Sequence, residues 1–402
     1  GQFIKHNIKN NQPGGKMKVK GYSDDWGGMY FMNNNNLLLD SLILTDFLEW
    51  QAHNNSIKGH VYIHHRMDHS YFRCFDNNFY GNVTIISNVR EFNFIERGNV
   101  YHGDVDFTVT NIADVDFDFE DNVYYGNLSL HIQNVGTNRI FPNKTYSAIH
   151  GNLTVTGFTS CYINPNRMNL PTIGGQLNID ISGGLTTILG IYRMKHATGG
   201  GRIAINNVKF FSFENNEVIA DSLVFTNFGQ SHFTGEPQNM VDNNITGHIR
   251  IDGFFDNRSP VTVGRNNIKG NVKIIMPYRG MLWDLGNEYE GDVEYHFADK
   301  ENGELDPATM YIGKESAPFY RGNVTIHNQN RYNFLQIFPM GLAGLDGDFT
   351  YVEEGGFGDI YINQNGMPCA TISGKVDIRC MPASTLNRFF MTRLKNSGGG
   401  SV

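Results

Sequence analysis

The stretch at residues 59–63 reads GHVYI, and the same pattern returns as GNVTI at 81–85, GDVDF at 103–107, GNLSL at 126–130 and GNLTV at 151–155. In each copy a glycine is followed by residues that alternate between polar and apolar, which predicts a short strand with one buried face. We call the first position of the pattern the anchor. The anchors are Gly15, Asp40, Gly59, Gly81, Gly103, Gly126, Gly151, Gly175, Gly201, Asp221, Gly247, Gly270, Gly291, Gly322 and Gly347. They recur at an average spacing of about 24 residues, so the sequence indicates a repeat protein.

Asparagine recurs four residues before the anchor. It stands there as Asn36, Asn55, Asn77, Asn99, Asn122, Asn243, Asn266 and Asn287. Asparagine is typical of tight bends, and a repeat of this length is too short for a strand followed by a full crossover helix. Each repeat is therefore predicted to be one coil of short strands. Stacked coils pair each strand with its copies above and below in a parallel β-helix, with the asparagines aligned in an internal ladder.

This pattern resembles the right-handed parallel β-helix superfamily, which includes pectate lyases, polygalacturonases, phage tailspikes and bacterial surface adhesins. The resemblance rests on the coil length, the strand pattern and the recurring asparagine, and it covers about residues 15–380. It implies an all-β protein, a single right-handed parallel β-helix solenoid of about 14–16 coils.

The two ends depart from the repeat. Residues 1–14 are expected to form an N-terminal arm or cap. Residues 381–402 are expected to form a short helix, capped by Ser384 and with Leu386, Phe389, Phe390 and Leu394 on one face, followed by a flexible Gly/Ser tail.

The charge balance and the distribution of apolar residues exclude some classes of binding partner. The 32 basic and 40 acidic residues give a formal charge of −8, which argues against nucleic acid as a partner. The sequence has no apolar stretch long enough to predict a membrane span. The first residues have neither an initiator Met nor a signal-type apolar core, which suggests a mature, processed or excised chain.

The segment ADVDFDFEDN at 113–122 is expected to present Asp114, Asp116 and Asp118 on one outward strand face. The preceding coil has Arg90, Glu91 and Asn93 at comparable positions, and the following coil has His131, Gln133 and Arg139. Clustered carboxylates are what glycoside hydrolysis or uronate elimination requires, which makes Asp116 and Asp118 candidate catalytic residues. Their oxygens also allow calcium, and no other cofactor is predicted. A solvated polar face or a glycan-binding surface accounts for the same residues.

A second polar segment, HVYIHHRMDH at 60–69, contains His60, His64, His65, Asp68 and His69. Its spacing does not match a recognisable zinc motif, and His64 and His65 must lie on opposite faces of any strand. No metal site is predicted.

The residue immediately before the anchor is Lys58, Tyr80, His102, Tyr125 and His150 in five successive coils. Each should face outward, because the residues before them, Ile57, Phe79, Tyr101, Tyr124 and Ile149, occupy the alternate, inward position. Stacked coils would place the rings in one exposed stripe, and aromatic faces bind sugar rings. The predicted glycan-binding residues are Tyr80, His102, Tyr125 and His150, together with Arg90 and His131. A ladder that only stabilises the solenoid is the alternative.

The resemblance and these residues together predict a surface-recognition protein of the phage tailspike, fibre or bacterial adhesin type. It would bind polysaccharide on its lateral face and would lie outside the cell, on a cell surface or on a virion. A polysaccharide lyase or glycoside hydrolase on the same scaffold is the second hypothesis. The motifs of polygalacturonases and the pectate-lyase calcium and arginine set are missing, so catalysis is left open. The third hypothesis is a structural subunit of a virion or secretion assembly. The resemblance to tailspikes also permits a homotrimer.

Overall fold

The computed structural model describes residues 3–6, 14–21, 29–47, 49–65, 69–88, 91–110, 115–133, 136–141, 146–167, 171–180, 188–196, 201–208, 210–226, 238–253, 261–276, 280–297, 308–313, 316–329, 332–337, 344–354, 357–362, 370–380, 387–391 and 394–396. The chain divides into two compact units, Gly1–Arg202 and Ile203–Val402. Throughout the described ranges the regular structure is β-strand, and none of it is helix long and apolar enough to cross a membrane.

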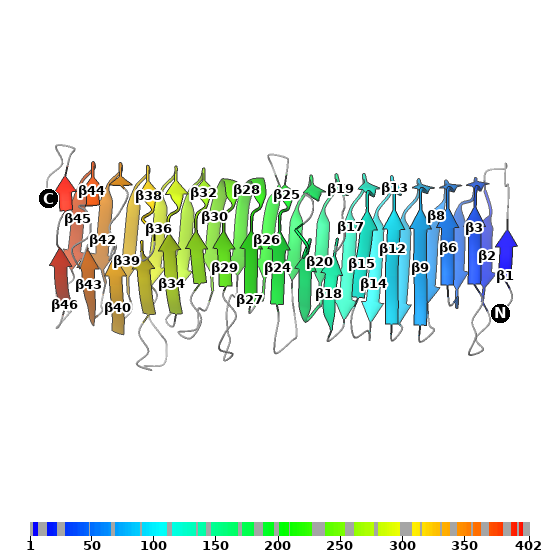
Figure 1. Ribbon diagram of the computed structural model, residues 1–402, viewed down its shortest axis with the longest axis horizontal. Helices are drawn as coiled ribbons and strands as arrows, with labels where there is room; N and C mark the ends of the chain where they lie inside the picture. The colour runs from blue at the N-terminus through cyan, green and yellow to red at the C-terminus, as the bar shows by residue number, and fades with distance from the viewer. Residues whose placement is uncertain are drawn as a thin grey trace. The chain divides into compact units, whose positions relative to one another are not determined.

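Each unit is a parallel β-solenoid, consistent with the right-handed β-helix expected from the sequence (Figure 1). In the first unit a typical coil contributes one strand to sheet A, then a short and a long strand to sheet B. The sheet A strands are β1 (Phe3–His6), β3 (Met29–Asn33), β6 (Glu49–His53), β9 (His69–Phe75), β12 (Glu91–Arg97), β15 (Val115–Glu120), β18 (Thr137–Ile140), β21 (Ser160–Ile163) and β24 (Ile188–Tyr192).

The sheet B strands of the first unit follow the same order of coils. The short strands are β4 (Asn36–Leu37), β7 (Ser56–Ile57), β10 (Asn78–Phe79), β13 (Val100–Tyr101), β16 (Val123–Tyr124), β19 (Ala148–Ile149), β22 (Thr172–Ile173) and β25 (Lys195–His196). The long strands are β2 (Lys16–Lys20), β5 (Ser41–Thr45), β8 (His60–His65), β11 (Val83–Asn88), β14 (Val105–Thr110), β17 (Leu128–Gln133), β20 (Leu153–Thr156) and β23 (Leu177–Asp180).

The second unit repeats this plan. Its sheet A strands are β27 (Phe210–Glu214), β29 (Gln238–Val241), β31 (Val261–Gly264), β34 (Gly280–Leu285), β37 (Ala308–Ile312), β40 (Tyr332–Ile337), β43 (Phe357–Ile362) and β46 (Asn387–Met391). Its sheet B strands are β26 (Arg202–Asn206), β28 (Glu217–Thr226), β30 (Asn244–Asp252), β32 (Asn267–Ile268), β33 (Val272–Met276), β35 (Glu288–Tyr289), β36 (Val293–Phe297), β38 (Phe319–Tyr320), β39 (Val324–Asn328), β41 (Gly344–Leu345), β42 (Phe349–Glu353), β44 (Ala370–Ile372), β45 (Val376–Cys380) and β47 (Leu394–Asn396).

The alternating strand pattern places every second side chain in the interior of the coil. In β14, Val105, Phe107 and Val109 are buried and the residues between them are half-exposed. The parallel register then stacks equivalent side chains from successive coils, so that Phe94 lies on Phe117 with ring centroids 5.2 Å apart. These stacked aromatic side chains, together with the aliphatic residues of the same inward face, form the apolar core of the coils.

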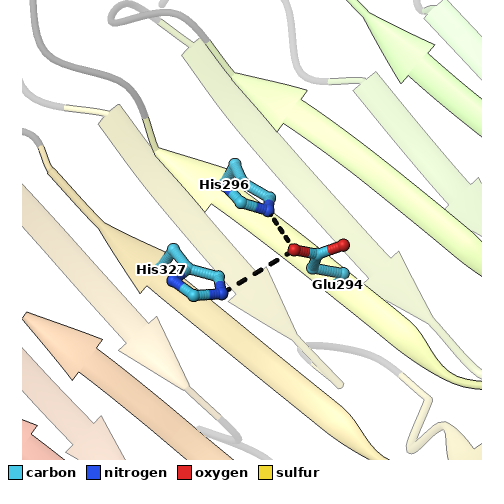
Figure 2. A group of neighbouring side chains, drawn as sticks. All are labelled: Glu294, His296 and His327. Carbon is cyan, nitrogen blue, oxygen red and sulfur yellow. Dashed lines mark hydrogen bonds and ion pairs between the residues drawn. The ribbon is translucent and has the colours of Figure 1, made fainter.

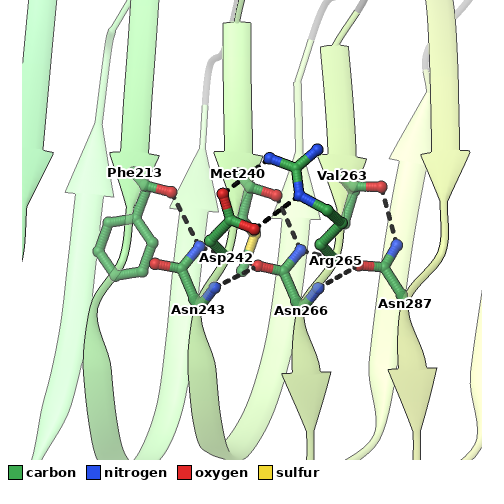
Figure 3. A network of polar contacts seen from close by, with 8 residues as sticks. All are labelled: Phe213, Met240, Asp242, Asn243, Val263, Arg265, Asn266 and Asn287. Carbon is green, nitrogen blue, oxygen red and sulfur yellow. Dashed lines mark hydrogen bonds and ion pairs between the residues drawn. The ribbon is translucent and has the colours of Figure 1, made fainter.

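The predicted asparagine ladder is present inside the coils (Figure 3). The Asn243 side chain donates to Asn266 Oδ1 at 2.9 Å, and Asn266 donates in the same way to Asn287. Each amide also donates to a main-chain carbonyl, Asn266 to Met240 and Asn287 to Val263, both at 2.8 Å. These side chains are buried, so the ladder satisfies polar groups at these bends that would otherwise be costly to bury.

In the first unit the ladder runs through Asn35, Asn55, Asn77, Asn99 and Asn122. The sequence prediction of Asn36 is wrong by one residue, because Asn36 is exposed and pairs with Ser56. This coil has one more residue between its ladder asparagine and its anchor Asp40 than the next coil has before Gly59. A constant spacing of four residues before the anchor therefore points to Asn36, although Asn35 is the ladder residue.

The anchor glycines lie where consecutive coils come closest. A Cβ on Gly81 would lie 2.5 Å from the carbonyl oxygen of Gly59, and a Cβ on Gly126 would lie 2.5 Å from that of Gly103. No side chain fits at such a distance, which explains why glycine recurs.

Directly after the anchor lies a second, exposed ladder that the sequence reading did not identify. In it Asp104 N–H donates to Asn82 Oδ1 at 3.1 Å, Asn127 N–H donates to Asp104 Oδ1 at 2.8 Å, and Asn152 N–H donates to Asn127 Oδ1 at 2.9 Å.

The two ends join the strand pattern. Phe3–His6, within the expected arm, forms β1 and pairs with β3. The predicted C-terminal helix is wrong over its described part, because Asn387–Met391 and Leu394–Asn396 form β46 and β47. Phe389 and Phe390 align with Ile360 and Tyr361 of β43, so pairing with an open sheet edge outweighs their helical spacing. Ser384, Leu386 and the Gly/Ser tail lie outside the described residues.

Candidate functional site

The predicted stripe forms in the first unit, on the turns that follow the short strands of sheet B. The rings of Tyr80, His102, Tyr125 and His150 stack in sequence, with centroids 4.5, 5.3 and 5.0 Å apart and interplanar angles of 10° or less. Tyr80 is 41% exposed and Tyr125 is 54% exposed. The residues before them face inward as expected, since Phe79, Tyr101 and Tyr124 are buried and stack on one another.

The stacking determines which part of each ring faces solvent. Because the rings stack nearly parallel at these centroid distances, each covers much of the flat surface of its neighbour. At one end Lys58 Nζ lies 3.1 Å from the centroid of Tyr80. At the other end the next coil places Gly174 at the position of His150 and so adds no ring to the stack. The stripe therefore presents ring edges, with their hydroxyl and nitrogen atoms, and one terminal imidazole face.

The acidic face lies on sheet A. Asp116 aligns with Asn93 in the coil before and with Arg139 in the coil after, as the sequence predicted. Asp116 Oδ1 lies 2.9 Å from Arg139 Nε, and both side chains are half-exposed. The other described candidate, Asp118, aligns with Ile95 on the same sheet. This pairing of a carboxylate with a guanidinium across coils is the arrangement of a solvated ion pair.

Nearby, Arg97 Nε donates to Glu120 Oε2 at 2.7 Å. The hydrogen bond to Glu120 is the main cause of the raised pKa of Arg97, and the charges of Glu120, Asp118 and Asp121 add to it. The acidic residues of this face are thus partly neutralised by arginines from neighbouring coils. Asp114 and Arg90 lie outside the described residues, so the calcium expectation stays a prediction.

His131 does not join Asp116, so that part of the prediction is wrong. It lies in β17 of sheet B, where it aligns with Thr108 and Thr156, and its Nδ1 lies 2.9 Å from Thr156 Oγ1. Its other nitrogen, Nε2, lies 3.9 Å from Asp106 Oδ1. His131 lies five residues after its anchor Gly126, whereas Asp116 lies 13 residues after Gly103, so the two belong to different strands of the coil.

The histidines of β8 point in different directions. His60 is exposed, and its Nδ1 accepts a hydrogen bond from the Asn82 N–H, which places it in the outer ladder. His65 is buried and its ring Nδ1 lies 3.1 Å from the Phe47 carbonyl; burial lowers its pKa to about 4. His64 lies on the opposite, half-exposed face, as predicted. Asp68 lies outside the described residues.

The described residues bring one set of three metal-ligating side chains together, and the sequence reading missed it. Glu294 and His296 in β36 and His327 in β39 project from the same face of sheet B in the second unit (Figure 2). His296 and His327 lie five residues after their anchors Gly291 and Gly322, so comparison of the same offset in consecutive repeats would have found the pair.

Comparisons of the chain with protein-family models, with curated proteins and with solved structures found no match.

Proposed function

We propose that this chain is a β-solenoid surface-recognition protein that binds polysaccharide along the stripe of Tyr80, His102, Tyr125 and His150. The observation that carries the proposal is the continuous exposed stack of these four rings in four successive coils. Its ring spacing is close to the length of one sugar unit in an extended polysaccharide. A chain that lies along the stripe can therefore present one unit to each coil.

The chemistry of the stripe suits hydroxyl-rich ligands. Tyrosine hydroxyls and imidazole nitrogens both donate and accept hydrogen bonds, which matches the hydroxyl groups of a glycan. The ring faces are shared between neighbours, so recognition depends on the ring edges and on the outer face of His150. Such contacts are shallow, and affinity would come from several of them along one glycan chain.

The proposed setting is extracellular, on a cell or virion surface, as for the tailspikes, fibres and adhesins that the sequence pattern resembles. A rigid solenoid holds its lateral side chains at fixed spacing, so little ordering entropy is lost on binding. Catalysis at Asp116 and Asp118 has no comparable support, because Asp116 is engaged with Arg139. Assembly of several copies is compatible with the same role.

The test is a double substitution that keeps the stack and removes its hydroxyls. Tyr80→Phe with Tyr125→Phe should weaken binding to the glycans recognised by the wild type by about tenfold or more, because each lost hydrogen bond is worth about 0.5–1.5 kcal/mol. Binding is measured on an array of bacterial capsular, lipopolysaccharide and plant polysaccharides, and thermal unfolding confirms that the variant is folded.

Tyr71→Phe is the matched control. Tyr71 is a similarly exposed tyrosine, but it lies on β9 of sheet A, away from the stripe. This variant should bind as the wild type does. Equal glycan binding by the wild type and the double variant would contradict the proposal and would leave the stack as a purely stabilising ladder.

A further inference from the structure

The cluster of Glu294, His296 and His327 arises from the register of two strands in the second unit. Glu294 and His296 are two residues apart on β36 and therefore share its outward face. His327 is the register partner of His296 on the neighbouring strand β39. Two positions along one strand and one position across it form a compact triangle of side chains.

The ligand atoms of this triangle converge. Glu294 Oε1 lies 3.7 Å from His327 Nε2 and is in hydrogen-bond contact with His296 Nε2. The three ligand atoms all lie within 4.8 Å of one another (Figure 2). Zinc ligands lie about 2.0–2.2 Å from the ion and hence about 3–3.5 Å from each other, so small side-chain rotations bring these atoms to a common centre.

A second observation also points to a bound metal. The ring nitrogen of His327 that faces away from the cluster has a carboxylate beside it. Its Nδ1 faces Glu354 Oε1 at 3.6 Å, and Gln329 Nε2 donates to the other oxygen of Glu354. A carboxylate behind the second ring nitrogen is the usual support of a metal-binding histidine, since it fixes the tautomer and directs Nε2 toward the metal. Here Nε2 is directed toward Glu294.

The two oxygens of Glu294 have different neighbours. Lys273 Nζ lies 3.1 Å from Oε2, which leaves Oε1 facing the two imidazoles. The three side chains are between one quarter and about one third exposed, so the site is open to solvent on one side.

We propose that Glu294, His296 and His327 bind one divalent transition-metal ion of the zinc class. Two imidazoles and one carboxylate suit zinc, nickel, copper or cobalt, whereas calcium requires six or more oxygen ligands. Three protein ligands leave an open coordination position toward solvent. The imidazole rings stack at 4.5 Å with an interplanar angle of 15°, so metal binding must tilt them out of this stack.

The test is calorimetric titration of the full chain with zinc chloride in metal-free buffer. The wild type should bind one equivalent with micromolar or tighter affinity, and an excess of calcium should not displace the zinc. His296→Ala and His327→Ala should each weaken zinc binding by about a hundredfold, and Glu354→Gln by about tenfold through loss of orientation. Circular dichroism establishes that each variant keeps its β structure.

His248→Ala is the matched control. His248 lies in the same unit, is exposed and accepts a backbone hydrogen bond from Asn271 outside the cluster. Its removal should leave zinc affinity unchanged. Cobalt gives an independent readout, because the bound ion should show visible ligand-field absorption that is lost in His327→Ala. A wild type without a saturable zinc site, or alanine variants that bind zinc as the wild type does, would overturn the proposal.

Discussion

Glu96 is a carboxyl group inside the first unit, fully buried among aromatic residues. The hydroxyl of Tyr124 donates to its Oε2 at 3.1 Å, and the Asn122 amide approaches the same oxygen at 3.3 Å. Burial raises the pKa of Glu96 to about 8, although the nearby hydroxyls of Tyr101 and Tyr124 act in the opposite direction. Asp284 has the same role in the second unit, where Tyr289 and Tyr320 donate to its Oδ2 and burial raises its pKa.

The raised pKa predicts a pH-dependent stability. The folded state holds the Glu96 proton more tightly than the unfolded state, so this stabilisation is complete below about pH 4.5 and is lost as the pH rises through about 8. Glu96→Gln stays neutral at every pH. It should match the wild type near pH 5 and exceed it in stability at pH 9, by on the order of 3–5 kcal/mol. Melting temperatures of both proteins between pH 5 and 9 measure this, and a pH-independent difference would argue against the account.

Single residues also show where sequence reasoning succeeded. The stripe was predictable because its members occupy one fixed position before the anchor, next to an inward-facing residue. The members of the Glu294, His296 and His327 cluster belong to two coils, so only a comparison of equivalent positions in consecutive repeats indicates it. His131 was misplaced because it lies five residues after its anchor Gly126, on sheet B, whereas Asp116 lies 13 residues after Gly103, on sheet A.

At the scale of elements, the bends depend on the buried asparagine ladder. Asn99 Oδ1 accepts from both the backbone and the side chain of Asn77, and its amide donates to the carbonyl of Cys74 at 2.9 Å. The exposed outer ladder makes similar bonds in water, as Asn127 does with Asn152. The two ladders therefore form a matched pair that differs in burial.

Asn99→Ala should destabilise the first unit by about 2–4 kcal/mol, because it leaves buried donors and an acceptor without partners. Asn127→Ala should cost about 1 kcal/mol or less, since water replaces the lost hydrogen bonds. Chemical denaturation followed by tryptophan fluorescence compares the two, with buried Trp50 as a reporter in the same unit. Equal losses of stability in the two variants would show that burial does not determine how much a ladder asparagine contributes to the free energy of unfolding.

The end of the chain shows why one element was predicted wrongly. Apolar residues at 386, 389, 390 and 394 fit a helix, yet Phe389 and Phe390 pair with β43. The series of anchors found in the sequence ends at Gly347, so the repeat gave no signal for this coil. The open edge of the preceding coil decides the outcome, and that edge is a tertiary feature. Elsewhere the anchor, the ladder and the alternation agree, and the strands follow the sequence pattern.

At the scale of the whole molecule, the chain repeats one coil and changes the side chains that each coil presents outward. The repeat accounts for the solenoid in both units, whereas function depends on side chains that differ from coil to coil. The stripe of the first unit and the Glu294 cluster of the second unit are two such local departures. The two proposed sites can be tested separately, because glycan binding and zinc binding are measured with different ligands and different substitutions.

The most direct test of polysaccharide recognition is size-exclusion chromatography of bacterial capsule, lipopolysaccharide and plant polysaccharides after incubation with the purified protein. We expect the protein to co-elute with at least one intact polysaccharide, whose size distribution stays unchanged. Asp116→Asn should co-elute in the same way, because Asp116 takes no part in the proposed binding. Shortened polysaccharide that is lost with Asp116→Asn would contradict the account and indicate an enzyme, and a protein that co-elutes with none of the polysaccharides would contradict recognition by the stripe.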